Sequence, residues 1–316
     1  MTRVAVTSRT FSRHPVLRRE LLARYPDAAF NDSGLVLAGE GLIRFLSGHD
    51  KAITGLEKLD AGVFAALPEL KVVSKFGVGV DMIDLAAMAS AGVRFGWTGG
   101  TNKRSVAELV IALTISLLRH VPEANRAVVA GSWPQFPGRH LSGRTVGIVG
   151  CGHVGKDLAK LLRAFGCRVL TNDIRNFPDF YERYGIEPVE LETLLKESDV
   201  VTLHVPLDAT TRDMLSAERL NLMKKDAVLI NAARGGLIDE QALAAMLKSG
   251  RLAGAACDVF AKEPPADLEL ARLPNFIATP HIGGAAEEAT LAMGRAAIKG
   301  LDDNRIPERG IFPDGY

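Results

Sequence analysis

The sequence has few cysteines, almost no excess charge and no long apolar run. Its three cysteines, Cys151, Cys167 and Cys257, lie far apart without a C-x-x-C pair, which argues against a disulfide framework and a zinc site. Lys and Arg total 38 against 37 for Asp and Glu, and the net charge of +1 does not favour a polyanion. The longest apolar stretch, around residues 109–118, is shorter than the roughly 18 to 20 residues that cross a bilayer. We therefore expect reduced thiols, no metal ion, no nucleic acid and no membrane.

The N-terminus has no recognisable secretion signal. Met1 and the residues after it lead directly into a strand-like pattern, without the basic segment, apolar segment and cleavage site of a signal peptide. We therefore expect a cytoplasmic protein. The 316 residues are 47% hydrophobic and 24% charged, which is typical of a folded globular protein with about two domains.

Short β-branched runs alternate with amphipathic helical stretches along most of the chain. This alternation is typical of an α/β fold in which helices cover both faces of a parallel sheet. In the first third, the strand-like runs are residues 4–6, 51–53, 71–74 and 93–95. They predict one small open sheet.

A second series of strands begins after a Gly/Pro-rich connection at residues 131–138. Its six strand-like runs are residues 145–149, 168–171, 200–203, 227–230, 253–257 and 276–278. Six is the strand count of a doubly wound, Rossmann-type dinucleotide-binding sheet. A last helical stretch, about 284–300, follows this sheet, and we expect it to return to the first domain. The expected domains are therefore 1–100 with 285–316, and 101–284.

Three glycines lie where the first strand of the second series turns into a helix. Gly150, Gly152 and Gly155 form a G-x-G-x-x-G pattern, which permits a tight turn, close approach of a pyrophosphate and packing of helix on strand. Asp173 ends the next strand, 173 − 155 = 18 residues later, where an acid that binds ribose hydroxyls is expected. The pattern predicts NAD binding, and Arg175, which could reach a 2′-phosphate, keeps NADP as an alternative. The competing interpretation is a glycine turn needed only for packing, with a solvated Asp173.

Three ionisable residues, Arg234, Glu263 and His281, follow strands of the second series on the side where open α/β sheets bind ligands. A guanidinium there can hold a carboxylate through two parallel hydrogen bonds. An imidazole can exchange a proton near neutral pH, and a carboxylate bonded to it can orient it and stabilise its protonated form. Each residue also has an ordinary alternative: a surface arginine, a solvated loop acid and a structural histidine. No spacing in the sequence proves that Glu263 contacts His281.

Seven short motifs follow one another along nearly the whole chain. They are residues 75–84 (KFGVGVDMID), 102–108 (NKRSVAE), 150–155 (GCGHVG), 204–206 (HVP), 231–236 (NAARGG), 258–264 (DVFAKEP) and 279–284 (TPHIGG). On these motifs the sequence resembles the NAD-dependent D-2-hydroxyacid dehydrogenases, in the group that includes phosphoglycerate dehydrogenase. The resemblance implies a Rossmann-type cofactor domain and a smaller, discontinuous, flavodoxin-like substrate domain, usually in a homodimer.

The resemblance implies roles for the three ionisable residues. Arg234 would bind the substrate carboxylate, His281 would be the acid/base at the C2 oxygen, and Glu263 would support His281. It also implies that Val78 and Gly79 offer backbone N–H groups to that carboxylate.

Other residues are assigned by the resemblance alone. Asn102 would line the substrate pocket, and Lys75 stands where related phosphoglycerate dehydrogenases carry a basic residue near the substrate phosphate. Asp258 would contact the nicotinamide carboxamide. The remaining implied cofactor contacts are His153, Val154, His204, Pro206, Ala232, Ala233 and Gly283, together with Arg234 and His281.

The implied reaction moves a hydride between NAD(H) and a D-2-hydroxy acid or its 2-keto acid, with His281 exchanging the hydroxyl proton. One expected substrate pair is 3-phosphoglycerate and phosphohydroxypyruvate, and the alternative is glyoxylate or hydroxypyruvate. Two other functions stay open on this fold: an NAD(H)-sensing interaction protein, as in transcriptional corepressors that share it, and oxidation of an oxyanion such as phosphite.

Overall fold

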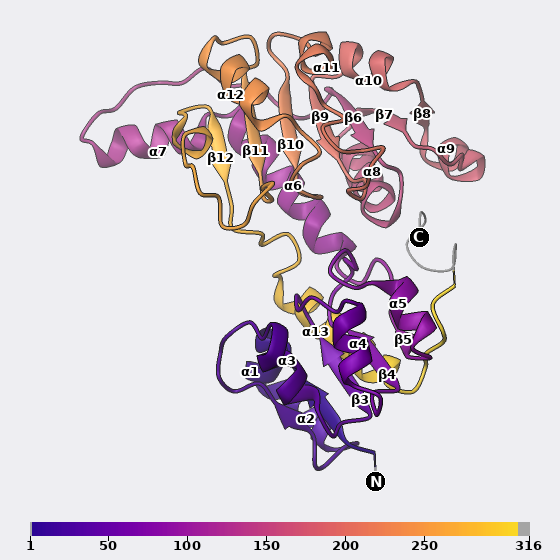
Figure 1. Ribbon diagram of the computed structural model, residues 1–316. Helices are drawn as coiled ribbons and strands as arrows, with labels where there is room; N and C mark the ends of the chain where they lie inside the picture. Colours follow the sequence, from indigo (N-terminus) through magenta and orange to yellow (C-terminus); the bar gives the residue numbers. More distant parts are fainter. Residues whose placement is uncertain (1, 309–316) are drawn as a thin grey trace. The chain divides into compact units, whose positions relative to one another are not determined.

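The computed structural model describes residues 2–308, and the chain divides into two compact units (Figure 1). The first unit comprises Met1–Asn102 and Ala286–Tyr316, and the second comprises Lys103–Ala285. The divisions fall one or two residues later than the sequence pattern suggests. Each unit is a parallel sheet with helices on both faces, which is the predicted α/β class.

The first unit contains a five-stranded parallel sheet in the order β2-β1-β3-β4-β5. Its strands are β1 (Val4–Val6), β2 (Ala29–Phe30), β3 (Lys51–Thr54), β4 (Val72–Lys75) and β5 (Arg94–Gly96). The order 2-1-3-4-5 is the flavodoxin-like one. The sequence pattern predicts four of these strands and misses β2, because two residues are too few to show an alternation.

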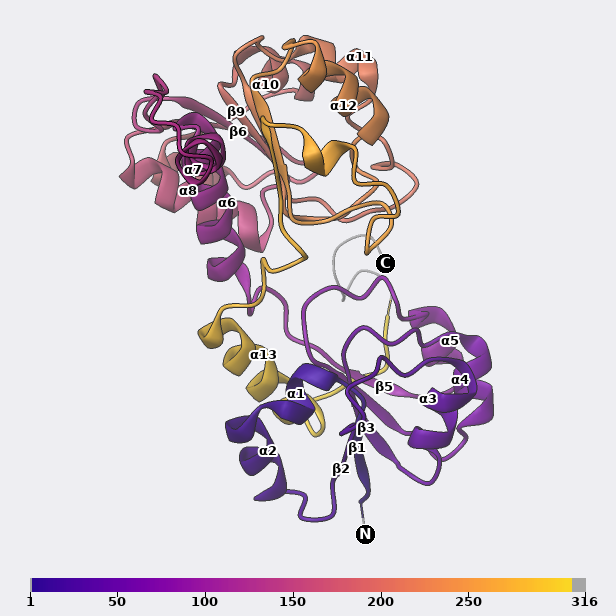
Figure 2. The same ribbon diagram turned by 90° about the vertical axis from the view of Figure 1, so that its left-hand side faces the viewer.

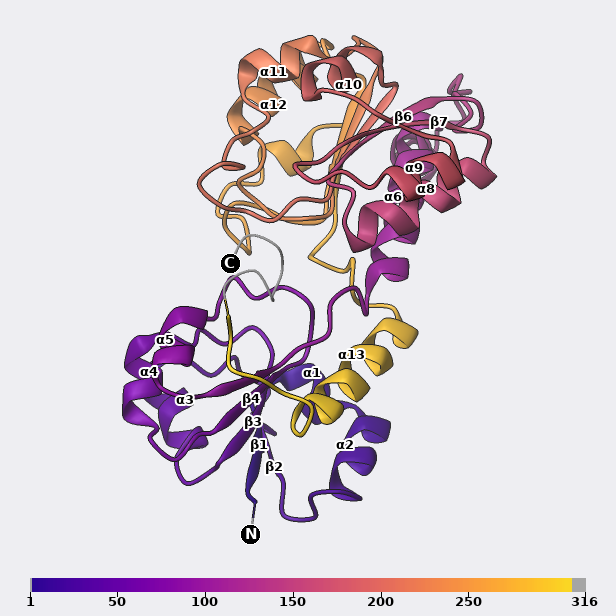
Figure 3. The ribbon, with the colours of Figure 1, turned by 90° about the vertical axis from the view of Figure 1, so that its right-hand side faces the viewer.

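Helices cover both faces of the first sheet (Figure 3). On one face lie α3 (Gly39–Leu46), α4 (Ala61–Ala66) and α5 (Leu85–Ser90), and on the other lie α1 (Arg9–Arg13), α2 (Pro15–Leu22) and α13 (Glu287–Gly300). The final helix is fixed to the sheet by its backbone, because the Ser74 hydroxyl donates to the carbonyl of Ala297 at 2.7 Å. A Cβ at Gly96 would lie 2.2 Å from the carbonyl oxygen of Gly300, so only glycine allows this approach.

The second unit contains a seven-stranded parallel sheet in the order β12-β11-β10-β9-β6-β7-β8. Its strands are β6 (Thr145–Val149), β7 (Arg168–Asn172), β8 (Ile186–Pro188), β9 (Val200–Leu203), β10 (Val228–Asn231), β11 (Gly254–Cys257) and β12 (Phe276–Ala278). Read from β8 toward β11, this is the doubly wound 3-2-1-4-5-6 order of dinucleotide-binding folds, extended by β12. The prediction of six strands is wrong by one. It misses β8, a three-residue edge strand that ends in proline.

The helices of the second unit also lie on two faces (Figure 2). They are α6 (Lys103–Leu118), α8 (His153–Ala164) and α9 (Pro178–Tyr184) on one face, and α10 (Leu191–Glu197), α11 (Ala217–Leu222) and α12 (Glu240–Lys248) on the other. The helix α7 (Val121–Val129) follows α6, and the 3-10 turn η1 (Leu270–Arg272) precedes β12. Within residues 2–308, no single helix is long and apolar enough to cross a membrane, and α6 and α7 reach that length only as a pair bent by 62°.

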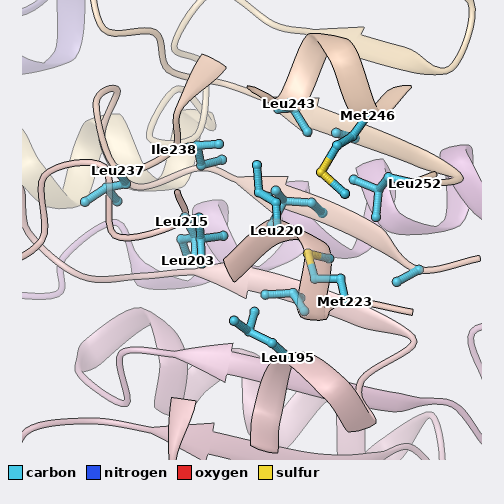
Figure 4. Close-up of a cluster of buried hydrophobic side chains, with 14 of the residues drawn as sticks. Leu195, Leu203, Leu215, Leu220, Met223, Leu237, Ile238, Leu243, Met246 and Leu252 are labelled. Carbon is cyan, nitrogen blue, oxygen red and sulfur yellow. The ribbon is translucent and has the colours of Figure 1, made fainter. Parts of the chain in front are cut away.

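An apolar core joins the second sheet to α10, α11 and α12 (Figure 4). Leu195, Leu220 and Leu243 from these helices are fully buried against the strands. Each such leucine stabilises the fold by roughly 1.5 to 3 kcal/mol relative to an exposed one. The core therefore holds the strand ends, and the loops that follow them, in fixed positions.

Six of the α-helices among residues 2–308 begin at a residue whose side chain accepts an N–H from the first turn, which satisfies an otherwise unpaired donor. Five of these residues are Ser8, Asp60, Asp84, Ser216 and Asp239, and the sixth is His14. The helix α8 differs, because it begins at Gly152, which has no side chain to serve as a cap.

Candidate active site

The turn between β6 and α8 contains three glycines, and close packing requires two of them. Gly150 has φ 99°, and a Cβ there would lie 2.5 Å from the carbonyl oxygen of His204. A Cβ at Gly155 would lie 2.1 Å from the Gly150 carbonyl oxygen. At Gly152, by contrast, no described atom lies within 4 Å of the Cβ position, apart from those of Gly152 and its two neighbours in the sequence. Two glycines therefore allow close packing, and the third leaves open space at the start of α8.

That open space lies at the N-terminus of α8. The first N–H groups of a helix have no partner within the helix itself, and Gly152 has no side chain that could cap them. The helix dipole adds partial positive charge at the same end. A pyrophosphate fits this combination of open space and N–H groups.

Asp173, directly after β7, joins the glycine turn to the neighbouring loop. One oxygen of its carboxylate accepts the N–H of Cys151 at 2.6 Å, and the other accepts the N–H of Arg175 at 2.8 Å. Each carboxylate oxygen can accept more than one hydrogen bond, so both remain able to accept ribose hydroxyls. The guanidinium carbon of Arg175 lies 5.1 Å from the ring centre of Phe177.

His204 and Pro206 follow β9, on the other side of the glycine turn. The Nε2 atom of His204 lies 2.9 Å from the hydroxyl of Thr202, and burial lowers the pKa of His204 to about 3. This imidazole is therefore neutral at physiological pH. The carbonyl of Pro206 accepts the hydroxyl of Thr211 at 2.7 Å, which fixes the course of the loop.

Arg234 lies in a turn after β10 that a buried asparagine organises. The amide of Asn231 donates to the carbonyl of Arg234 at 2.8 Å, and its oxygen accepts the N–H of Ala233 at 3.1 Å. A Cβ at Gly235 would lie 1.9 Å from the carbonyl of Phe260, so this turn packs directly on the loop after β11. The Arg234 guanidinium is half-buried and donates to the carbonyl of the preceding residue, Ala233, which follows Ala232 in the turn.

Asp258, at the end of β11, organises the loop that carries His281. Its buried carboxylate accepts the hydroxyl of Thr279 at 2.6 Å and the N–H groups of Ile282 at 2.8 Å and Gly283 at 2.7 Å. Its carbonyl accepts the N–H of His281 at 2.9 Å. These four bonds hold His281 at φ 56°, a left-handed conformation that is uncommon for a residue with a Cβ.

His281 and Glu263 are in direct contact. The Nδ1 atom of His281 lies 2.7 Å from one oxygen of the Glu263 carboxylate, and the other oxygen accepts the N–H of Phe260 at 3.1 Å. The sequence could not place these two residues together, and the structure does. The carboxylate orients the ring through Nδ1, so Nε2 is the nitrogen that faces away from it.

A cavity of about 360 Å³ opens beside this pair. The lining residues that matter for the site are Asp258, Phe260, Glu263, Leu268, Thr279 and His281. The imidazole and its carboxylate thus lie at a wall that is otherwise mostly apolar. Such a concave, mostly apolar site with a few polar groups is the usual form of a small-molecule site.

The other predicted substrate residues lie in the first unit. Val78 and Gly79 are half-buried in the loop after β4, and Asn102 is half-buried just before α6. Lys75, the last residue of β4, is 3% exposed, and its ammonium donates to the carbonyls of Gly55 and Phe76. The buried ammonium is thus engaged with backbone oxygens.

Sequence reasoning missed two side chains that shape these loops. Asn231 holds the turn of Arg234, and the indole N–H of Trp97 donates to the carbonyl of Val78 at 2.9 Å. An asparagine at a strand end is a signal for a local turn, and it could have been used. Trp97 follows β5 and carries no comparable signal, because its contact depends on the pairing of β4 with β5.

A match to a known protein family identifies the family of this chain. Residues 111–283 match the family model described as D-isomer specific 2-hydroxyacid dehydrogenase, NAD binding domain. The chain belongs to this family.

Relatives of this dehydrogenase family extend the match beyond that domain. The chain is 40% identical over 240 residues to the D-3-phosphoglycerate dehydrogenase of Methanocaldococcus jannaschii, covering 75% of this chain and 46% of that protein. It is 38% identical over 254 residues to the glyoxylate reductase of Thermococcus litoralis, covering 78% and 77%. The chain therefore matches less than half the length of the first relative and most of the second.

A solved structure shows the same two-unit fold. The D-lactate dehydrogenase of Aquifex aeolicus, complexed with NAD and lactic acid, has a TM-score of 0.80 at 27% identity, covering 94% of this chain and 93% of that one. The Rossmann-type and flavodoxin-like sheets of this chain are thus those of its family.

Proposed function

We propose that this protein interconverts a D-2-hydroxy acid and its 2-keto acid with NAD(H) as the hydride partner. The observation that supports this proposal most directly is the 2.7 Å contact between His281 and Glu263 beside a cavity. The same unit contains a glycine turn that fits a dinucleotide. Family membership supports the same reaction. The second unit is then the cofactor domain and the first the substrate domain.

The cofactor is held by the second unit. The glycine turn and the first turn of α8 bind the pyrophosphate, and Asp173 binds the ribose hydroxyls. A carboxylate at this position repels a 2′-phosphate, which favours NAD over NADP. The other residues proposed to line this site are His153, Val154, His204, Pro206, Ala232, Ala233, Asp258 and Gly283. When bound, the nicotinamide ring accepts or supplies the hydride at C2 of the substrate.

His281 moves the proton that accompanies the hydride. In the oxidative direction its Nε2 takes the proton of the C2 hydroxyl, and in the reductive direction it returns that proton to the C2 oxygen. Glu263 holds the ring through Nδ1, so it is a positioning residue. Arg234 binds the substrate carboxylate. In the first unit, the residues proposed to contact substrate are Val78, Gly79 and Asn102.

The substrate is a small 2-keto acid or the matching hydroxy acid. The named relatives include both a phosphoglycerate dehydrogenase and a glyoxylate reductase, so phosphohydroxypyruvate, hydroxypyruvate and glyoxylate form the panel that tests the proposal. These acids share the carboxylate and the C2 carbonyl. They differ only beyond C2, where pocket contacts would discriminate among them.

The test follows NADH and NADPH absorbance with purified protein and this panel. We expect turnover with NADH and a loss in kcat of at least about a hundredfold in His281→Ala and Arg234→Gln, the scale of a removed acid/base or charge-stabilising group. His140→Ala, at an exposed histidine, is the matched control and should retain turnover. If the wild-type protein binds NADH but reduces no acid, the proposed reaction is wrong.

We also propose that the protein works as a homodimer in the cytoplasm. Apolar side chains are exposed on and after α7, with Val129 and Trp133 each 80% exposed, and a second copy of this chain would cover them. The three cysteines are all free and buried, which suits a reducing compartment. Light scattering should give twice the mass of one chain, and a monomer at micromolar concentration would contradict the dimer. Cell fractionation tests the location.

A further inference from the structure

Lys75 is a buried cation with two backbone oxygens at its ammonium. It ends β4, is 3% exposed, and donates from Nζ to the carbonyl of Gly55 and, at 3.2 Å, to the carbonyl of Phe76. A lysine ammonium has three donors and no acceptor, and a buried charge is stable only when such donors are satisfied. Two of the three donors are thus directed at the loops that follow β3 and β4.

A buried acid completes this arrangement on the other side of Gly55. Glu57 is 3% exposed, and its carboxylate accepts the N–H of Gly55 at 2.6 Å. The same residue therefore gives its N–H to an acid and its C=O to Lys75. The two opposite charges polarise one short stretch of backbone and fix the loop after β3 to the loop after β4.

Lys75 and Trp97 together hold two peptide groups of the loop after β4. Lys75 binds the carbonyl of Phe76, and the indole of Trp97 binds the carbonyl of Val78 at 2.9 Å. In a planar trans peptide the C=O and the following N–H point in opposite directions. The N–H groups of Gly77 and Gly79 therefore point away from the two side chains that bind the carbonyls.

Glycine is required between these two peptides. Gly77 has φ 120°, and a Cβ there would lie 3.3 Å from the Nζ atom of Lys75. The positive φ thus favours glycine, and a Cβ there would also crowd the ammonium. N–H groups that point outward from such a loop can receive an anion.

We propose that Lys75 is a positioning residue, which together with Trp97 aims the N–H groups of Gly77 and Gly79 at the substrate carboxylate, and that it does not contact a substrate phosphate. The inference rests on the proposed function, because the anion is the carboxylate of the 2-keto acid. Every 2-keto acid carries that carboxylate. Loss of Lys75 should therefore weaken all of them by a similar factor, whether or not they carry a phosphate.

Hydroxypyruvate and phosphohydroxypyruvate are the matched pair for the test, because they differ only by the phosphate. In Lys75→Met we expect kcat/KM to fall at least about tenfold for both acids, mainly through a higher KM. The reason is that a displaced loop no longer directs its N–H groups at the carboxylate. Lys75→Gln keeps an N–H donor and should recover part of the loss for both. A fall for phosphohydroxypyruvate that exceeds the fall for hydroxypyruvate by more than about tenfold would show a phosphate contact and overturn the proposal.

Controls separate this outcome from misfolding and from failure of the proposed function. Lys71→Met, just before β4 at an exposed lysine that binds the carbonyl of Pro68, should leave both KM values unchanged. NADH affinity reports on the second unit and should be retained in each Lys75 variant. If wild type reduces hydroxypyruvate alone, unchanged kinetics in Lys75→Met would overturn the proposal. If wild type reduces neither acid nor glyoxylate, the proposed function itself has failed.

Discussion

The loop after β4 in the first unit and three loops of the second unit are fixed by opposite chemistry. In the loop after β4, side-chain donors bind backbone carbonyls: Lys75 binds that of Phe76 and also that of Gly55 in the loop after β3, and Trp97 binds that of Val78. In the three loops of the second unit, side-chain acceptors bind backbone N–H groups. Asp258 accepts from residues 282 and 283, Glu263 from residue 260, and Asp173 from residues 151 and 175.

This difference decides which groups each loop presents. Where carbonyls are bound by side chains, the N–H groups of the same peptides point the other way, and the backbone itself can receive an anion. Where N–H groups are bound by carboxylates, those N–H groups cannot receive an anion, and the loop presents a side chain instead, as at His281. The loop after β4 thus presents backbone donors, and the loop after β12 presents an ionisable side chain.

The largest effect is expected from Asp258→Asn, which removes the acceptor that holds the loop of His281. One amide oxygen cannot serve Thr279, Ile282 and Gly283 together, and the new NH₂ group faces a buried donor. We expect the free energy of unfolding to fall by about 2 to 4 kcal/mol. Turnover should fall with it, because His281 loses its left-handed conformation. Denaturant unfolding and kcat are the two measurements.

A matched control lies nearby in the chain. Asp267 is exposed, and one oxygen accepts the N–H of Glu269 at 2.8 Å. Asp267→Asn should change the free energy of unfolding by less than about 0.5 kcal/mol. Equal stability of the Asp258→Asn and Asp267→Asn variants would show that Asp258 does not organise the loop.

Much of the fold could be predicted because the central strands are buried on both faces. Such strands are continuous apolar runs, as in β9 and β10, and the sequence shows them directly. The strands it hides, β2 and β8, are the edge strands of their sheets and have two and three residues. An edge strand pairs with only one neighbour, so it tolerates Pro188 and a short length, and both weaken its pattern.

The site could be predicted less evenly. Motif glycines and the residues after strands were visible, because their roles follow from position in an α/β sheet. The contacts of Asp258 were not visible, since its partners lie 21 to 25 residues away and meet it only through the pairing of β11 with β12. Lys75 shows the same limit. Its place in a motif suggested a phosphate, and only the fold reveals two carbonyls at its ammonium.

The smallest effect is expected from Trp97→Phe, which keeps the apolar ring and removes the N–H that binds the carbonyl of Val78. One neutral hydrogen bond contributes about 0.5 to 1.5 kcal/mol, so KM for the 2-keto acid should rise roughly two- to tenfold while kcat changes little. Tyr25→Phe is the control, because it removes the hydroxyl that donates to Asp302 at 2.8 Å in the same unit, away from the loop after β4. If both variants lose thermal stability but neither changes KM, the indole contributes only packing. In that case Lys75 is the one side chain of the two that orients the N–H groups of the loop after β4.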